Sequence, residues 1–178
     1  MTKKRSPFTH VIKDQGVNIV WSYEYLGVTI DDQLKWDEHA SIVFKKANKR
    51  LYFLRKLKEF KIEPTLISLF YQATIQSILT FCIIGWGGNT SEKNKNKINY
   101  LIKRSGKLFG KSPLSFNDLL ESYCFRKIKF ITKDKTHPLF SFIKFSSRSG
   151  RVQYILTHTE RYRSSFLPFS VKFLNENR

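Results

Sequence analysis

Paired carboxylates at Asp31 and Asp32 are the first residues that could do chemistry, because carboxylates can hold the metal ions of phosphoryl-transfer sites. A two-metal site needs a further carboxylate to fix the second ion. The nearest aspartate upstream, Asp14, has no strand pattern around it. We therefore predict a turn and helix-cap role for the pair, and no metal site.

The histidines and cysteines form no stronger catalytic pattern. His158 and Glu160 could supply two ligands of a facial iron triad, but no histidine follows to complete it, and we expect both in a loop. Cys82 and Cys124 form neither a disulfide framework nor a zinc pattern. A Walker loop, a Gly-rich dinucleotide turn and a Gly-x-Ser-x-Gly elbow are all absent from the sequence. We predict no catalytic residues, no cofactor and no small-molecule substrate.

The elements around these residues begin with residues 17–30, whose β-branched and aromatic types predict a β-hairpin or two short strands. Gly27 in the second run suggests a bulge or a close backbone approach. Asp37 can cap a helix that runs to about Phe60. The apolar stripe of this helix follows i, i+3, i+4, i+7 spacing and consists of Ala40, Val43, Phe44, Ala47, Leu51 and Leu54.

More helices are predicted downstream. Pro64 can open the second helix, whose residues 65–86 carry no charge. That run is long enough to span a bilayer, but its Gln, Ser and Thr residues favour a core helix and no membrane. A third helix is expected at residues 91–110, a fourth at about 116–133, and a short closing helix at 165–174 after a basic loop.

Charge is concentrated in the chain after residue 37. The sequence has 32 basic and 14 acidic residues, a net charge of +18. Residues 38–60 hold seven basic and two acidic residues, and residues 87–133 hold eleven and three. A field of this sign attracts polyanions. Nucleic acid is the first candidate partner, an anionic membrane surface the second, and acidic proteins the third.

The cellular compartment is indicated by two observations. Two distant cysteines fit a reducing environment, and no apolar run follows the N-terminus, which predicts no signal peptide. We expect a nuclear or cytoplasmic location, with Lys3-Lys4-Arg5 as a weak import signal.

Several motifs, in order, resemble one family. A Tyr-Leu-Gly-Val-x-Ile-Asp run at residues 25–31 precedes Leu-x-Trp and a basic helix with Arg-Leu-Tyr-Phe-Leu-Arg at 50–55. Phe-Tyr-Gln at 70–72 leads to Gly-Trp-Gly-Gly at 85–88, and Leu-Ile-Lys-Arg-Ser-Gly follows at 101–106. His-Pro-Leu at 137–139 and Arg-Tyr-Arg-Ser-Ser-Phe-Leu-Pro at 161–168 close the series. Together they resemble the C-terminal part of reverse transcriptases of non-LTR (LINE-type) retrotransposons, over residues 17–175.

The resemblance implies a primer-grip-like hairpin at Tyr25, Leu26 and Gly27 and thumb-like helices after it. The fingers and the palm with its Tyr-x-Asp-Asp are absent from the sequence, so we expect no polymerase activity from this chain itself. Such tails are also grouped with the N-terminal domain family of an AlkB homologue that modifies transfer RNA. That label implies a 2-oxoglutarate dioxygenase or methyltransferase, yet the chain has no His-x-Asp with a distal His and no Gly-rich methyl-donor loop.

The predicted fold is mostly α: an N-terminal extension and small β-hairpin (1–36), a three- or four-helix thumb-like bundle (37–133), and a basic C-terminal segment with a short helix (134–178). The predicted partner is an RNA or RNA–DNA duplex, bound through phosphate contacts that do not read sequence. The residues expected to meet phosphates are Lys45, Lys49, Lys56, Lys103, Lys107, Arg161 and Arg163. The rival hypotheses are an oxygenase or methyltransferase and a non-functional fragment that exposes apolar surface.

Overall fold

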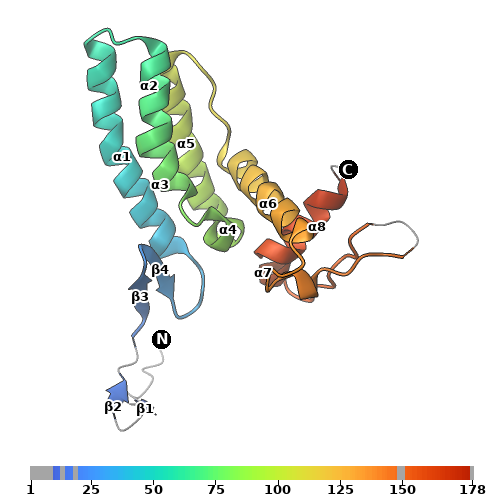
Figure 1. Cartoon of the computed structure of the whole chain (residues 1–178). Helices are drawn as coiled ribbons and strands as arrows, with labels where there is room; N and C mark the ends of the chain where they lie inside the picture. The colour runs from blue at the N-terminus through green and yellow to red at the C-terminus, as the bar shows by residue number, and fades with distance from the viewer. Residues whose placement is uncertain (1–9, 13–14, 18–19, 148–150, 177–178) are drawn as a thin grey trace.

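The computed structural model describes residues 10–12, 15–17, 20–147 and 151–176. The fold is mostly helical and carries antiparallel strands before its helices, which confirms the predicted fold class (Figure 1). Lys3-Lys4-Arg5 lies outside the described residues.

Two short hairpins precede the helices. β1 (His10–Ile12) pairs with β2 (Gln15–Val17), and β3 (Ser22–Tyr25) pairs antiparallel with β4 (Val28–Asp31). Leu26 and Gly27 connect β3 to β4 with φ angles of 48° and 81°. A two-residue hairpin turn with both φ angles positive is of type I′, which suits Gly at its second position. Gly27 is therefore a turn residue, and the expected bulge is wrong. The alternative of a close backbone approach is not seen either, because a Cβ at Gly27 would meet only the Phe81 ring, at 3.6 Å.

α1 (Asp37–Glu59) is the first long helix, and it begins one residue earlier than a cap at Asp37 would require. Trp36 is the N-cap, in the left-handed conformation, and no side chain caps the helix. Asp31 supplies the turn instead, because its carboxylate accepts hydrogen bonds from the N–H groups of Gln33, Lys35 and Trp36 at 2.9–3.1 Å. The predicted turn role of Asp31 is confirmed, and the cap role of Asp37 is wrong.

The second helical segment is broken into pieces. α2 (Pro64–Tyr71), with Pro64 at its first turn, continues through a π-helical turn, η1 (Gln72–Gln76), into α3 (Ser77–Thr80). The chain then kinks at Cys82, whose φ is 50°, before α4 (Ile83–Trp86) and the 3-10 turn η2 (Gly87–Asn89). The Trp86 Nε1–H donates to the Phe81 carbonyl at 2.9 Å, which satisfies a backbone group freed by the kink.

This uncharged segment covers one side of the bundle. By length and composition alone, Pro64–Asn89 could cross a membrane, and 33% of its most apolar stretch is buried within the fold. Ile67, Tyr71 and Ile75 face the core, whereas Leu66 and Leu69 are 54% and 60% exposed. The segment predicted to be a core helix therefore buries one face in the core and exposes the other.

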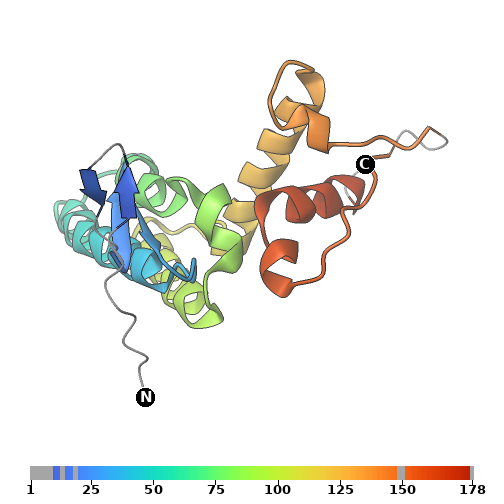
Figure 2. The same ribbon diagram turned by 90° about the horizontal axis from the view of Figure 1, so that it is seen from below.

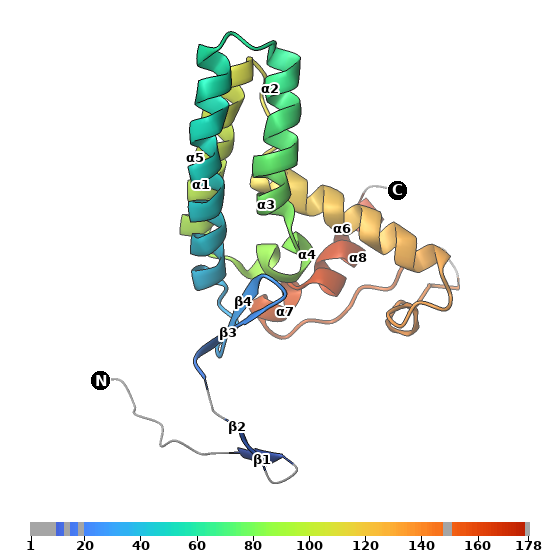
Figure 3. The same ribbon diagram turned by 60° about the vertical axis from the view of Figure 1, so that its left-hand side comes forward.

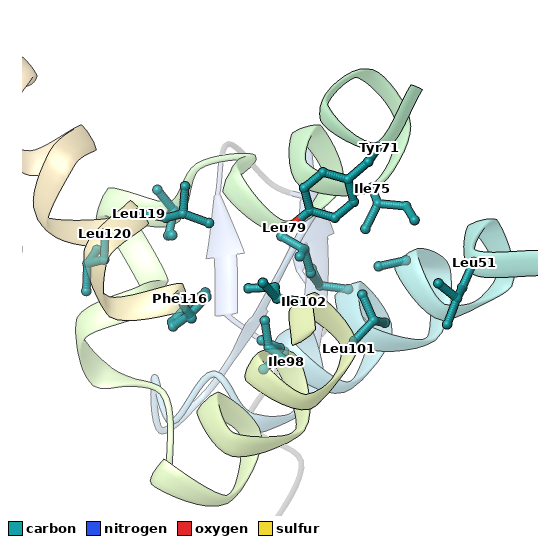
Figure 4. Packing of buried hydrophobic residues seen from close by; sticks show 14 of the residues in the cluster. Leu51, Tyr71, Ile75, Leu79, Ile98, Leu101, Ile102, Phe116, Leu119 and Leu120 are labelled. Carbon is teal, nitrogen blue, oxygen red and sulfur yellow. The ribbon is translucent and has the colours of Figure 1, made fainter. Parts of the chain in front are cut away.

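α5 (Glu92–Phe109) completes a three-helix bundle with α1 and the α2–α3 segment (Figures 1 and 3). It ends at Gly110, which takes the left-handed conformation and stands at the end of the helix predicted for residues 91–110. Interdigitated apolar side chains from all three segments form the main core, which also receives the first turns of the next helix (Figure 4). The residues that Figure 4 labels are Leu51, Tyr71, Ile75, Leu79, Ile98, Leu101, Ile102, Phe116, Leu119 and Leu120.

Figure 2 shows α6 (Phe116–Lys133) leaving the bundle. Its far half contributes Ile128 and Ile131 to a second core. Ser115 and Asp118 form a reciprocal capping box, which explains why the helix begins where predicted. The far half of α6 packs against α8 (Phe166–Glu176), and the 3-10 turn η3 (Phe140–Phe142) and α7 (Glu160–Arg163) lie in the connecting segment. α6 therefore contributes side chains to both cores. The predicted domain boundary after residue 133 stays a prediction.

Candidate nucleic-acid interface

The lysines of α1 form an exposed row. Lys45 and Lys49 lie one turn apart and Lys56 two turns further along the same face. Lys45 and Lys49 are exposed, and Lys56 is half-buried with 42% of its side chain accessible. The opposite face holds buried Leu51 and Leu54. The predicted outward orientation of this row is confirmed.

A second row lies on α5. Lys103 and Lys107 are exposed, while Leu101 and Ile102 beside them are buried. The guanidinium of Arg104, also exposed, lies 5.5 Å from the ring centre of Tyr100. This residue was not among the predicted contacts, although its position on the exposed face follows from the same helical spacing.

Hydrogen bonds at both ends hold the two helices side by side. At the start of the helices, the Asp37 carboxylate accepts from Ser91 Oγ at 2.6 Å and from Asn94 Nδ2 at 2.7 Å. At the other end, Lys58 Nζ donates to the Lys107 carbonyl at 3.4 Å. α1 and α5 therefore run parallel, with α2 against one side of the pair (Figure 3). We call the exposed basic side chains of α1 and α5 the α1/α5 surface.

Acidic side chains lie only at the ends of these helices. α1 has none between Glu38 and Glu59, and α5 has none after Glu92. Lys56 Nζ lies 2.6 Å from the Glu59 carboxylate, and this hydrogen bond and the negative charge of Glu59 raise the pKa of Lys56. Among the described residues, no acidic side chain lies within ion-pair distance of Lys45. Lys56 is the partly neutralised member of its row.

The two predicted arginines lie elsewhere. Arg161 and Arg163 belong to α7, and Arg163 Nη1 pairs with the Glu160 carboxylate at 2.8 Å. Arg161 lines a polar pocket that also includes Asp37 and Lys95, at the N-terminal ends of α1 and α5. The two arginines therefore do not extend the lysine rows. Arg161 lies near the N-terminal ends of α1 and α5, whereas Lys56 and Lys107 lie in the last turns of these helices.

Tyr25, Leu26 and Gly27 form the exposed tip of the β3–β4 hairpin, with Leu26 77% exposed. The hairpin is attached to α1 through the Thr29 N–H, which donates to buried His39 Nδ1 at 3.1 Å. Burial, and secondarily the charge of Lys46, lowers the pKa of His39, which favours the neutral ring that this hydrogen bond requires.

The carboxylates considered for catalysis take structural roles. Burial raises the pKa of Asp31, but the hydrogen bonds from the backbone N–H groups of Lys35, Trp36 and Gln33 outweigh it, so that the net pKa is lowered. His158 lies just before α7, in the loop where it was expected, and Glu160 is the first residue of that helix, so its predicted loop position is wrong. Within the described part of the chain, no group of three or more His, Cys, Asp or Glu side chains could hold a metal ion.

α6 adds basic residues that the sequence reasoning did not select. Arg126 and Lys129 are exposed, and Lys127 is half-buried. Arg126 lies 4.6 Å from the ring centre of Tyr123, and Lys129 lies 4.1 Å from that of Phe125. Four of the eleven basic residues counted over residues 87–133 lie on this helix, but their placement over aromatic rings depends on the folded structure.

Comparison with known proteins gives one match. The family model described as "Alkylated DNA repair protein alkB homolog 8, N-terminal" matches residues 36–77, which run from Trp36 through α1, α2 and the π-helical turn to the first residue of α3. No curated protein and no solved structure matches the chain. The AlkB-homologue likeness thus applies to the first two segments of the bundle, which include the α1 lysine row.

Proposed function

We propose that the chain binds the sugar–phosphate backbone of a nucleic-acid duplex through the α1/α5 surface, without reading sequence. The observation that carries this proposal is the pair of exposed lysine rows on parallel helices whose central turns contain no acidic residue. Duplex nucleic acid presents a dense line of negative charge, and exposed lysines that neutralise it release counterions. The expected partner is an RNA or RNA–DNA duplex in a nuclear or cytoplasmic, reducing compartment.

The motif series at residues 25–168 supports an origin in a non-LTR reverse transcriptase. In this proposal the chain is the thumb-side remnant of an RNA-directed DNA polymerase, and the hairpin tip at Tyr25, Leu26 and Gly27 approaches the primer strand. The chain grips nucleic acid and does not catalyse polymerisation itself, because the sequence contains no Tyr-x-Asp-Asp.

A second candidate is favoured by the match at residues 36–77. In that case the chain would serve as an accessory module of an AlkB-type nucleic-acid-modifying protein, and any dioxygenase or methyltransferase chemistry would belong to another domain. In both candidate functions α1 binds nucleic acid. They differ in the enzyme with which the chain would be associated.

The test is a fluorescence-anisotropy titration of the purified chain with a labelled RNA–DNA hybrid duplex at several salt concentrations. We expect log affinity to fall with log salt at about −0.9 per phosphate neutralised, with a total slope that corresponds to roughly four or more contacts. Duplexes of unrelated sequence should bind equally. A folded, monomeric chain that does not bind at low salt would refute the proposal.

A further inference from the structure

A pocket of about 450 Å³ lies where α6 passes the kink between α3 and α4. Figure 3 shows α6 leaving the bundle beside this junction. The left-handed Cys82 separates α3 from α4, and Tyr123 of α6 is held there by a 3.3 Å hydrogen bond from its hydroxyl to Thr80 Oγ1. The kink and the helix that crosses it thus create the pocket together.

The lining of the pocket combines an apolar floor with a cationic rim. Ile83 and Ile84 contribute aliphatic surface, and Tyr123 and Phe130 contribute aromatic rings. The only charged side chains among the described residues that line it are Arg126 and Lys127. The volume falls within the range of about 300–1,000 Å³ that is usual for ligand sites.

Each of the two cations lies over an aromatic ring of the pocket. Arg126 Cζ is 4.6 Å from the centre of the Tyr123 ring, and Lys127 Nζ is 5.3 Å from that of Phe130. Phe130 is 56% exposed, so its ring is available to a ligand. Flat apolar surface next to fixed positive charge is complementary to a base and its phosphate, because bases stack on aromatic rings and on guanidinium planes.

We propose that this pocket binds an unpaired nucleotide of a single-stranded extension, with its base against Phe130 and Arg126 and its phosphate near Lys127. The inference rests on the proposed duplex binding, which it extends: the α1/α5 surface would hold paired backbone, and the α6 pocket would hold the strand end. Two cations without a lining carboxylate favour a polyanion over an apolar peptide.

Cys82 offers a direct probe of occupancy. It is one of two cysteines in the chain, it is exposed, and it lines the pocket. The other, Cys124, is buried, and burial raises the pKa of its thiol to about 11, which keeps it unreactive near neutral pH. A thiol reagent should therefore modify Cys82 selectively.

The experiment measures the rate of Cys82 modification, together with binding affinity, for three hybrids: blunt, extended by a short single strand, and extended by an abasic strand. We expect only the base-containing extension to slow modification and to tighten binding, by at least about fivefold given typical stacking energies. Phe130→Ala and Arg126→Gln should abolish that gain. The matched controls Phe142→Ala and Lys133→Gln alter residues that are also exposed but lie outside the pocket lining, and they should preserve the gain.

The outcomes separate this inference from the proposed function. Blunt duplex binding with no gain and no protection from the extension would overturn the pocket assignment and leave duplex binding intact. Equal protection by the abasic strand would overturn the stacking role, and equal protection by poly-glutamate would overturn the nucleotide specificity. Failure of every hybrid to bind would overturn the proposed function as well.

Discussion

Removing Lys45 and Lys49 together should weaken duplex binding in a salt-dependent way. Both side chains are exposed, they lie one helical turn apart, and neither belongs to an ion pair among the described residues. The double substitution Lys45→Ala/Lys49→Ala keeps good helix formers at both positions. Its effect should therefore fall on binding, with the fold retained.

The expected magnitude follows from counterion release. Each lost phosphate contact removes about 0.9 from the slope of log affinity against log salt, so the double variant should lose about 1.8. At 0.1 M salt this corresponds to about 60-fold weaker binding, and the difference should vanish as the salt concentration approaches about 1 M.

The assay is the anisotropy titration with the hybrid duplex over a series of salt concentrations. Lys135→Ala/Lys144→Ala is the matched control, because it removes the same charge from exposed positions outside α1 and α5 that belong to no ion pair among the described residues. We expect the control to retain the parent slope. If both double variants lose the same slope, or if the loss for Lys45 and Lys49 does not shrink with salt, the localised α1 contact is refuted.

Three further predictions follow from individual contacts. Glu59→Gln frees Lys56 from its ion pair and should raise duplex affinity by up to about eightfold at 0.1 M salt, measured by the same titration; unchanged affinity would mean that Lys56 does not meet phosphate. The pKa of His39 in the folded state is lowered from its ordinary 6.5, so this ring takes up a proton at a higher pH in the unfolded state than in the folded state. The free energy of unfolding should therefore fall as pH drops below about 6.5. Urea melts of His39→Asn at the same pH values should not show this loss of stability. If the free energy of unfolding falls equally with pH in both proteins, then protonation of the His39 ring, whose Nδ1 accepts from the Thr29 N–H, is not the cause. Gly88→Ala places a Cβ against a backbone carbonyl of the segment after α7 and should lower the melting temperature, whereas Gly85→Ala, whose Cβ meets open space, should have little effect.

The helices were predictable where local signals fix their ends. α6 begins where expected because Ser115 and Asp118, which form its capping box, are close neighbours in the sequence. Gly110 ends α5 in a left-handed conformation that glycine adopts without strain. The kink at Cys82 was not predictable. A left-handed non-glycine residue is unfavourable by itself, and here a hydrogen bond from Trp86 to the Phe81 carbonyl stabilises the kinked chain.

The candidate site was likewise predictable only in part. Outward placement of the α1 and α5 lysines follows from helical spacing, so the sequence alone predicted it. The role of Asp37 did not follow, because its partners Ser91 and Asn94 lie more than fifty residues away. The pocket beneath Arg126 depends on how α6 crosses a kink that no local pattern signals.

The most direct test of duplex binding by the α1/α5 surface is lysine footprinting, in which acetylation of each lysine is measured by mass spectrometry with and without a saturating hybrid duplex. If the α1/α5 surface binds the duplex, we expect strong protection of the exposed lysines of the two rows, Lys45, Lys49, Lys103 and Lys107. We expect little protection of Lys172, which lies on α8. Uniform protection of all lysines, or protection confined to residues outside α1 and α5, would contradict duplex binding by the α1/α5 surface.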